Sequence, residues 1–195
     1  MPNILWIDTE TTGVRPEKHD IIQISGCVQL MNGELVDWFD FKLKPLNFDT
    51  IDDGALAVNK TTREELFLYP DAQTQLELFF ELIGKYAKDY NNRLSVGGYN
   101  VKFDINMLQY ELYKIYGEEA GGKMYFKYFT SRFLDPFALI PMVEEKTGKT
   151  FKAPKLTEVY KTIFNEDLEG AHDAKHDIYA TVKLYYFFQK LFINK

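Results

Sequence analysis

The sequence predicts an α/β protein in which helices pack against one mixed β-sheet. Short β-rich runs fill the first part of the chain, and amphipathic helical patterns alternating with further short apolar runs follow them. No Ser/Pro-rich linker, internal repeat or low-complexity tract divides the 195 residues, a length typical of one domain. We therefore expect a single domain over residues 1–195, with the element order β-β-β-α-β-α-β-α.

Three strands are predicted in the N-terminal part. Residues 4–9 form a short apolar run that ends in threonines and a glycine, and this brevity favours a buried strand over a helix. Residues 21–30 and 35–43 are also β-rich. They flank Asn32-Gly33, a tight-turn signal, so we expect these two runs to form a hairpin.

The rest of the chain predicts helices separated by short strands. Residues 45–71, with two prolines and an Asp-Asp-Gly, are expected to be irregular. Helical spacing begins at residue 72, where the apolar face comprises Leu76, Phe79, Phe80, Ile83 and Ala87. The remaining predicted elements are a strand at 94–99, a helix at 103–116, a strand at 124–134, and helices at 136–145, 156–164 and 173–192. Asn100 is a plausible N-cap for the helix at 103–116.

Composition and charge exclude several classes of protein. A chain that is 46% hydrophobic is too apolar to be disordered. A net charge of −6 argues against a protein that coats DNA by bulk electrostatics. The single cysteine, Cys27, cannot form an internal disulfide, which favours a reducing compartment. Because no run approaches the roughly 20 apolar residues of a membrane span and the N-terminus does not resemble a signal peptide, we expect a cytoplasmic protein without a membrane partner.

Four acidic residues lie where the hydrophobic pattern predicts burial. Asp8 and Glu10 fall on one side of the first strand, at its C-terminal end. Asp104 lies in the first turn of its helix, on the apolar face, although a first-turn acid often only complements the helix dipole. Asp177 heads the apolar stripe of the last helix, where an unpaired carboxylate would be costly. A metal ion would neutralise these acids; a buried salt bridge is the alternative for Asp177.

This set of acids predicts a site for divalent cations. Hard oxygen ligands without cysteine favour Mg²⁺ or Mn²⁺ over zinc. Two such ions about 3.5–4 Å apart stabilise both the attacking and the leaving oxygen in a phosphoryl displacement. His172, five residues before Asp177, suits a loop position from which it can accept a proton from water; an ordinary loop histidine is the alternative. His176 is a weaker candidate for this proton acceptor because its helical angle differs from that of Asp177. We expect no catalytic role for His19.

Together these residues resemble the DEDDh branch of the DnaQ-like exonucleases. The first motif is Asp-Thr-Glu-Thr-Thr-Gly at 8–13, the second is Gly-Tyr-Asn-Val-Lys-Phe-Asp at 98–104, and the third is His-x4-Asp at 172–177. Each motif is weak alone, but three in order at plausible spacing are specific. The resemblance implies an RNase H-like sheet and the release of 5′-mononucleotides, one at a time, from a 3′ end.

The resemblance also assigns roles to individual residues. It implies that two Mg²⁺ or Mn²⁺ ions bind, one to Asp8, Glu10 and Asp177 and one to Asp8 and Asp104, and that His172 is the general base. The residues implied to hold the terminal nucleotide are Thr9, Thr11, Thr12, Val58, Asn59, Asn100 and Phe103. Asn59 stands where proofreading relatives often have histidine, and Phe103 equally suits a core position.

Single-stranded DNA is the expected substrate, in proofreading or end-trimming, with a DNA polymerase as a possible partner. RNA is the closest alternative, and a non-catalytic nucleic-acid-binding or polymerase-docking module is a more distant one. Residues 120–155 are locally basic, which suits either strand guidance or an ordinary solvated face. The aromatic run at 185–188 hints at a partner or a dimer.

Overall fold

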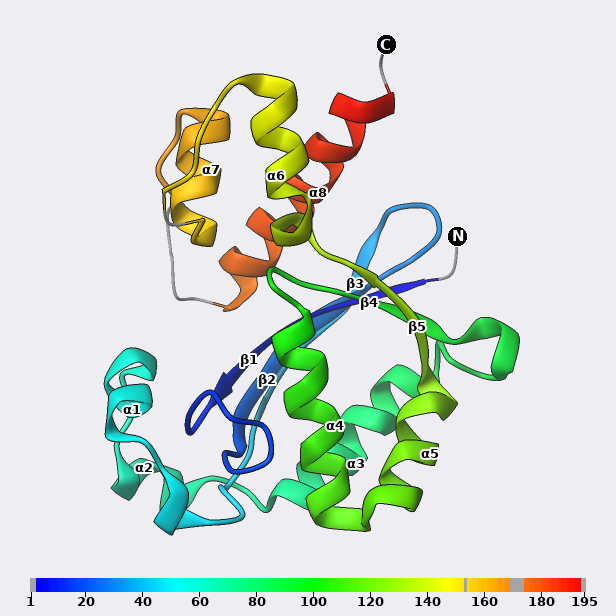
Figure 1. The fold of residues 1–195 in the computed structure, drawn as a ribbon. Helices are drawn as coiled ribbons and strands as arrows, with labels where there is room; N and C mark the ends of the chain where they lie inside the picture. The colour runs from blue at the N-terminus through cyan, green and yellow to red at the C-terminus, as the bar shows by residue number, and fades with distance from the viewer. Residues whose placement is uncertain (1–2, 153, 169–173, 194–195) are drawn as a thin grey trace.

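A computed structural model describes residues 3–152, 154–168 and 174–193 (Figure 1). Its centre is a five-stranded sheet in the order β3-β2-β1-β4-β5. The strands are β1 (Ile4–Thr11), β2 (Ile21–Gln29), β3 (Leu35–Lys42), β4 (Leu94–Gly97) and β5 (Phe129–Leu134). β2 pairs antiparallel with β1 and β3, whereas β4 pairs parallel with β1 and β5. The sheet is therefore mixed, and the predicted hairpin is confirmed.

Eight α-helices surround the sheet in the described part of the chain. They are α1 (Asp53–Asn59), α2 (Arg63–Leu68), α3 (Ala72–Gly84), α4 (Lys102–Tyr116), α5 (Glu118–Tyr128), α6 (Pro136–Thr147), α7 (Leu156–Phe164) and α8 (Ala174–Ile193). In Figure 1, α3, α4 and α5 lie below the sheet, and α6, α7 and the C-terminal part of α8 lie above it. None of the described helices combines the length and the apolar character needed to cross a membrane.

The continuous apolar run of β1 is explained by burial on both faces. Leu5 and Ile7 belong to the main core, which α3 and α4 complete. Trp6 points to the other face and packs with Cys27 and with Ile178 of α8. Both faces of the apolar part of β1 are therefore covered, and the first motif follows at the C-terminal end of this strand.

Two predicted segments differ from the structure. Residues 45–71 are not wholly irregular, because α1 and α2 form there: Asp52 caps α1, and Thr62 with Glu65 forms a capping box on α2. The strand predicted at 124–134 is a strand only from Phe129, since residues 118–128 form α5. Tyr125 of α5 is 3% exposed in the main core, so tertiary packing outweighs the β-propensity of this aromatic segment.

Candidate active site

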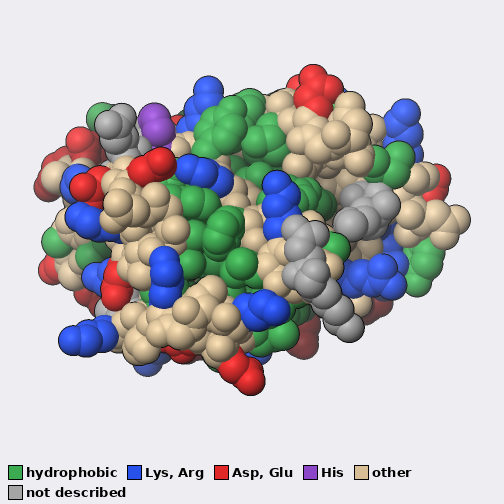
Figure 2. All heavy atoms as spheres, turned by 90° about the horizontal axis from the view of Figure 1, so that it is seen from above, with side chains coloured by type: hydrophobic (Ala, Val, Ile, Leu, Met, Phe, Trp, Pro, Cys, Tyr) green, Lys and Arg blue, Asp and Glu red, His purple; other side chains and the backbone are tan. Residues whose placement is uncertain are grey.

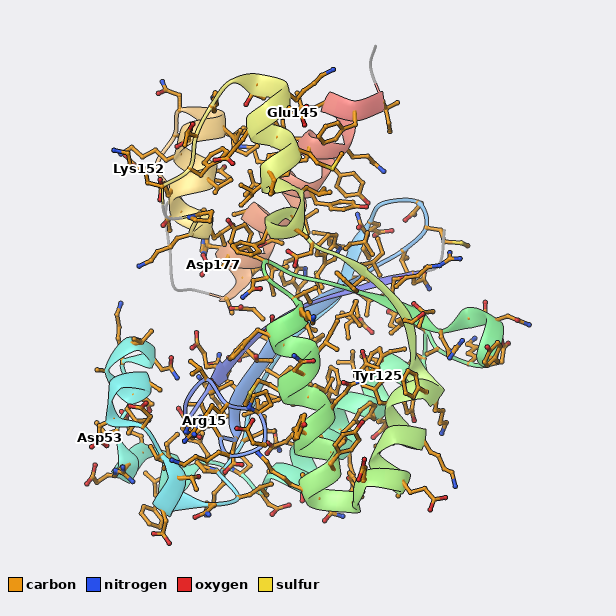
Figure 3. All side chains as sticks on the ribbon, viewed as in Figure 1. Arg15, Asp53, Tyr125, Glu145, Lys152 and Asp177 are labelled. Atoms are coloured by element: carbon orange, nitrogen blue, oxygen red, sulfur yellow. The ribbon has the colours of Figure 1, made fainter. Side chains whose placement is uncertain are left out.

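The acids of the three motifs come from three elements that meet at the C-terminal end of β1. Asp8 and Glu10 lie near this end, opposite Ser25 and Gln23 of β2. Asp104 lies in the first turn of α4, and Asp177 lies in the first turn of α8. Figure 3 shows Asp177 at the sheet end of α8, close to the start of α4. Asp8 and Asp177 line one cavity of about 150 Å³.

Carboxyl groups crowd together in and around this cavity. Burial, followed by the charges of Glu10 and Asp177, raises the pKa of Asp8 to about 7. Asp104 is 4% exposed, and burial and the charge of Asp8 hold its pKa well above the usual range of an aspartate. Each carboxylate thus makes ionisation of its neighbour harder. A divalent cation would relieve this repulsion, so the electrostatics favour cation binding.

Asp104 is held from one side by the first motif. The backbone N–H of Thr9 donates to Asp104 Oδ1 at 2.9 Å, and the Thr9 hydroxyl donates to the same oxygen at 2.6 Å. Two donors on one oxygen fix the carboxylate and leave Oδ2 for another ligand. Because successive side chains of a strand point to opposite faces, Thr9 and Asp8 point away from each other. Thr9 contacts Asp104 of α4, whereas Asp8 lies on the side of α8.

The donor set fits divalent cations by its chemistry. Asp8, Glu10, Asp104 and Asp177 offer only carboxylate oxygens, which are the ligands of Mg²⁺ and Mn²⁺. In residues 3–152, 154–168 and 174–193, no group of three or more His, Cys, Asp or Glu side chains is arranged so that it could hold a metal ion. His172, the expected general base, lies outside the described residues.

The predicted nucleotide-binding threonines end β1 and are tied to α1. Thr11 and Thr12 are buried, and the Asn59 side-chain amide donates to the Thr11 carbonyl oxygen at 2.9 Å. The N–H of Asp52 donates to the Thr12 carbonyl oxygen at 2.9 Å. These bonds anchor both ends of α1 to the motif, and Val58, 72% exposed, lies next to Asn59. One Asn59 N–H is therefore already used structurally.

The second motif turns sharply before α4. Asn100 has a left-handed φ of 58°, so it does not cap α4; the residue before the helix is Val101, which has no side-chain cap bond. Instead, the N–H of Asn100 donates to Asp135 Oδ1 at 2.9 Å. Phe103 is partly buried and packs against the main core.

Asp135 is a site-supporting residue that the sequence reasoning missed. It is 7% exposed, and its Oδ1 accepts both the Asn100 N–H and the N–H of Phe137 in the first turn of α6. The Asp-Pro pair before α6 is a typical helix start and could have identified the cap. The long-range bond to Asn100 depends on the parallel β4–β5 pairing, which local sequence does not reveal.

The loop after the first motif is built around His19. No catalytic role was predicted for His19, and the structure places it at 4% exposure, with its ring where a side chain on Gly13 would lie. His19 Nδ1 accepts the N–H of Arg15 at 2.9 Å. In Figure 3, Arg15 lies in this loop between α1 and α4. Gly13 is thus required by close packing.

A buried charge cluster supports the same loop. Thr12 and Asp20 exchange two hydrogen bonds of 2.9 Å. Asp20 Oδ1 also accepts from Lys114 Nζ at 2.8 Å, and Glu111, which is 0% exposed, lies 3.6 Å from the same nitrogen. The sequence analysis did not single out Glu111. Its position seven residues after Asp104, on the apolar face of α4, could have identified it.

The basic residues of 120–155 do not form one surface. They are divided among α5, β5, the end of α6 and the segment before α7, and Figure 1 places α5 and α7 at opposite ends of the molecule. On the face drawn in Figure 2, Lys and Arg side chains are dispersed among hydrophobic and polar ones. Figure 3 places Lys152 beside α7, on the outside of the molecule.

Comparison with known proteins agrees with this geometry. The chain matches the RNase T family, described as exonuclease, over residues 5–185. It is 27% identical over 189 residues to the 3′-5′ DNA exonuclease Cap18 of Escherichia coli, covering 95% of this chain and 90% of that protein.

Solved structures of exonuclease I share the fold. One exonuclease I structure superposes with a TM-score of 0.73 and 18% identity, covering 98% of this chain and 43% of that one. The zinc-bound form of an E. coli exonuclease I complex with single-stranded DNA superposes with a TM-score of 0.75 and 17% identity, covering 98% and 42%. The chain thus spans less than half the length of exonuclease I, and the likeness establishes an RNase H-like fold.

Proposed function

The chain belongs to the RNase T exonuclease family, and from this premise we propose that it is a metal-dependent 3′–5′ exonuclease that removes mononucleotides from single-stranded DNA. The observation that carries the proposal is the convergence of Asp8, Asp104 and Asp177 from β1, α4 and α8, in which Asp8 interacts electrostatically with both of the others. Buried carboxylates that repel one another are costly unless a bound cation or substrate chemistry uses them.

The proposed roles follow from the position of each side chain. Asp8, Glu10, Asp104 and Asp177 would hold two Mg²⁺ or Mn²⁺ ions, and these would polarise the scissile phosphate and lower the pKa of a water molecule. Thr9 orients Asp104 through its two hydrogen bonds. His172, two residues before the start of α8, accepts the proton of the attacking water. That assignment rests on the His-x4-Asp spacing and on the near-neutral pKa of imidazole.

The terminal nucleotide is proposed to lie between the end of β1, α1 and the start of α4. Thr11 and Thr12, which are both buried, support this region from the end of β1, and the exposed Val58 offers an apolar contact to the terminal base. Because such contacts require no base-edge hydrogen bond, sequence preference should be weak. Asn100 and Phe103 form the opposite wall.

DNA is preferred over RNA in this proposal because the relative Cap18 is named a DNA exonuclease and the exonuclease I complex contains single-stranded DNA. The test is the digestion of 5′-labelled DNA and RNA strands of matched sequence, with Mg²⁺, Mn²⁺ or EDTA. We expect a metal-dependent ladder that shortens from the 3′ end and forms faster on DNA.

Asp8→Ala is the control against contaminating nucleases and should give no ladder. Faster digestion of RNA would overturn the substrate assignment but not the chemistry. No digestion of either polymer by a folded wild-type chain would overturn the enzymatic proposal. His172→Ala should lose most of the rate while retaining Mg²⁺ binding; unchanged turnover would remove it as the base.

A further inference from the structure

Lysine and tyrosine alternate along the exposed face of α8. Lys175, Tyr179, Lys183, Tyr186 and Lys190 are separated by four, four, three and four residues, so they share one side of the helix. Asp177 and the buried stripe of α8 lie on other sides. Lys175, Tyr179, Lys183 and Lys190 are exposed, and Tyr186 is partly buried. The stripe begins at Lys175, near the acids, and ends at Lys190, about 22 Å further along α8 at 1.5 Å per residue.

Two grooves run along this stripe. The first, about 490 Å³, is lined by Glu10 and Asn59 of the site and by Trp38 of β3 and Lys175. The second, about 720 Å³, lies between α8 and the β2–β3 turn. Its lining includes Gln29, Asn32, Tyr179, Lys183, Tyr186 and Lys190.

An aromatic contact joins the two grooves. The rings of Trp38 and Tyr179 have centroids 4.8 Å apart at 33°, and Lys175 Nζ lies 5.2 Å from the Trp38 ring. Tyr186 is fixed by a 3.0 Å bond from its hydroxyl to Gln29 Oε1. The aromatic rings therefore have set positions along a continuous path that starts at Glu10.

The charge of the second groove differs from that of the whole chain. The protein carries −6, yet the described residues lining this groove include two lysines and no acid. Lys183 is shared with α7, since its Nζ donates to the Tyr160 hydroxyl at 2.7 Å and to Glu166 at 3.3 Å. Lys190 has no such carboxylate among the described contacts. In the first groove, Asp40 is engaged by Ser25 at 2.8 Å.

We propose that this Lys–Tyr face of α8, with the β2–β3 turn, is an extended binding track for single-stranded DNA. Lysines along a groove neutralise successive phosphates, and tyrosine and tryptophan faces stack bases without reading their sequence. The side-chain amide of Asn32, on the exposed β2–β3 turn, can hydrogen-bond base edges. The inference rests on the proposed exonuclease activity for its placement, but strand binding by the track is measurable without turnover.

The decisive test compares a long strand with a minimal substrate. The p-nitrophenyl ester of thymidine 5′-monophosphate reaches only the acids and the terminal pocket, whereas a long oligonucleotide also reaches the track. Tyr179→Ala, at a residue that is 48% exposed, should raise KM for the long strand about tenfold, within the range for loss of one stacked base. Its kcat/KM on the ester should stay within about twofold of wild type.

Lys190→Glu supplies the charge test, and Lys123→Glu on α5 is its matched control, with the same change in net charge at a lysine paired with Glu119. Strand affinity is measured by fluorescence anisotropy in an Asp8→Asn background, so that digestion does not interfere. Lys190→Glu should weaken binding at least about fivefold and reduce the slope of log K against log salt by about 0.7. Lys123→Glu should change neither.

The proposal would be overturned if strand affinity and salt slope were the same in Lys190→Glu, in Lys123→Glu and in the parent. Loss of ester hydrolysis together with strand binding in Tyr179→Ala would also overturn it, since the residue would then act on the site or the fold. If wild type digested no DNA, the exonuclease proposal would fail, and the anisotropy series would still decide whether the track binds a strand.

Discussion

Thr9 donates two hydrogen bonds to a single oxygen of Asp104, one from its backbone N–H at 2.9 Å and one from its hydroxyl at 2.6 Å. This pair links β1 to α4 across 95 residues of sequence. A threonine in the first motif thus positions an acid of the second motif, and the two motifs form one structural unit.

Thr9→Val tests this link. The substitution keeps the shape of the side chain and the backbone bond but removes the hydroxyl donor, and a hydrogen bond to a charged group contributes about 1.5–3 kcal/mol. We expect kcat to fall about tenfold or more, with a higher Mg²⁺ concentration at half-maximal rate, measured on the p-nitrophenyl ester. Thr9→Ser keeps the donor and should retain most of the rate. Equal rates for Thr9→Val and Thr9→Ser would show that the hydroxyl does not position Asp104.

Asp177→Ala should remove nearly all turnover while the fold survives. The side chain lies at the surface of the cavity in the first turn of α8, and its charge contributes to the raised pKa of Asp8. Removing that charge relieves repulsion, so the melting temperature without metal should not fall. Turnover and circular dichroism are measured together, with Asp167→Ala, an exposed acid paired with Lys161, as the control. A variant with the full rate would exclude Asp177 as a metal ligand.

Sequence reasoning singled out the acids because each breaks a hydrophobic pattern. Asp177 heads a stripe that the structure buries at Ala180, Thr181, Leu184 and Phe188, as expected. The supporting residues behave differently: Asp135 looks like an ordinary helix cap, and His19 looks like part of a charged loop. Their roles depend on the β4–β5 pairing and on packing against Gly13, which are long-range contacts. Spacing identifies residues that conflict with their local hydrophobic pattern. The role of a residue that fits its local pattern can be recognised only from the folded structure.

Metal binding should depend on pH through Asp8. Its pKa of about 7 in the folded chain lies above the ordinary 3.8, so without metal the folded state holds extra proton and loses stability as pH rises through this interval. Mg²⁺ competes with that proton. The increase in melting temperature on adding Mg²⁺ should therefore be larger at about pH 8 than at about pH 6.

Differential scanning fluorimetry across this pH range checks the expectation without any turnover. Asp8→Asn removes both the titrating group and a ligand, and it should abolish most of the Mg²⁺ effect at both pH values. A Mg²⁺ effect that is the same at both pH values in wild type would contradict the coupling. A persistent effect in Asp8→Asn would place the ion elsewhere.

Glu111→Gln should change how stability depends on pH. Burial, and then the charge of Asp20, raises the pKa of Glu111 from 4.5 to about 8, although Lys114 opposes the shift. Between these values the folded chain binds more protons than the unfolded chain, so Glu111 makes the wild type less stable as pH rises. Glutamine keeps an acceptor for the Ile21 N–H and cannot ionise. The variant should thus gain melting temperature relative to wild type as pH increases from about 5 to about 9, by about 2–4 °C for each kcal/mol relieved.

Glu119→Gln is the control, because it makes the same change at an exposed glutamate. Its difference in melting temperature from wild type should stay constant across this pH range. A constant difference in Glu111→Gln as well would mean that the buried carboxyl does not titrate in this interval.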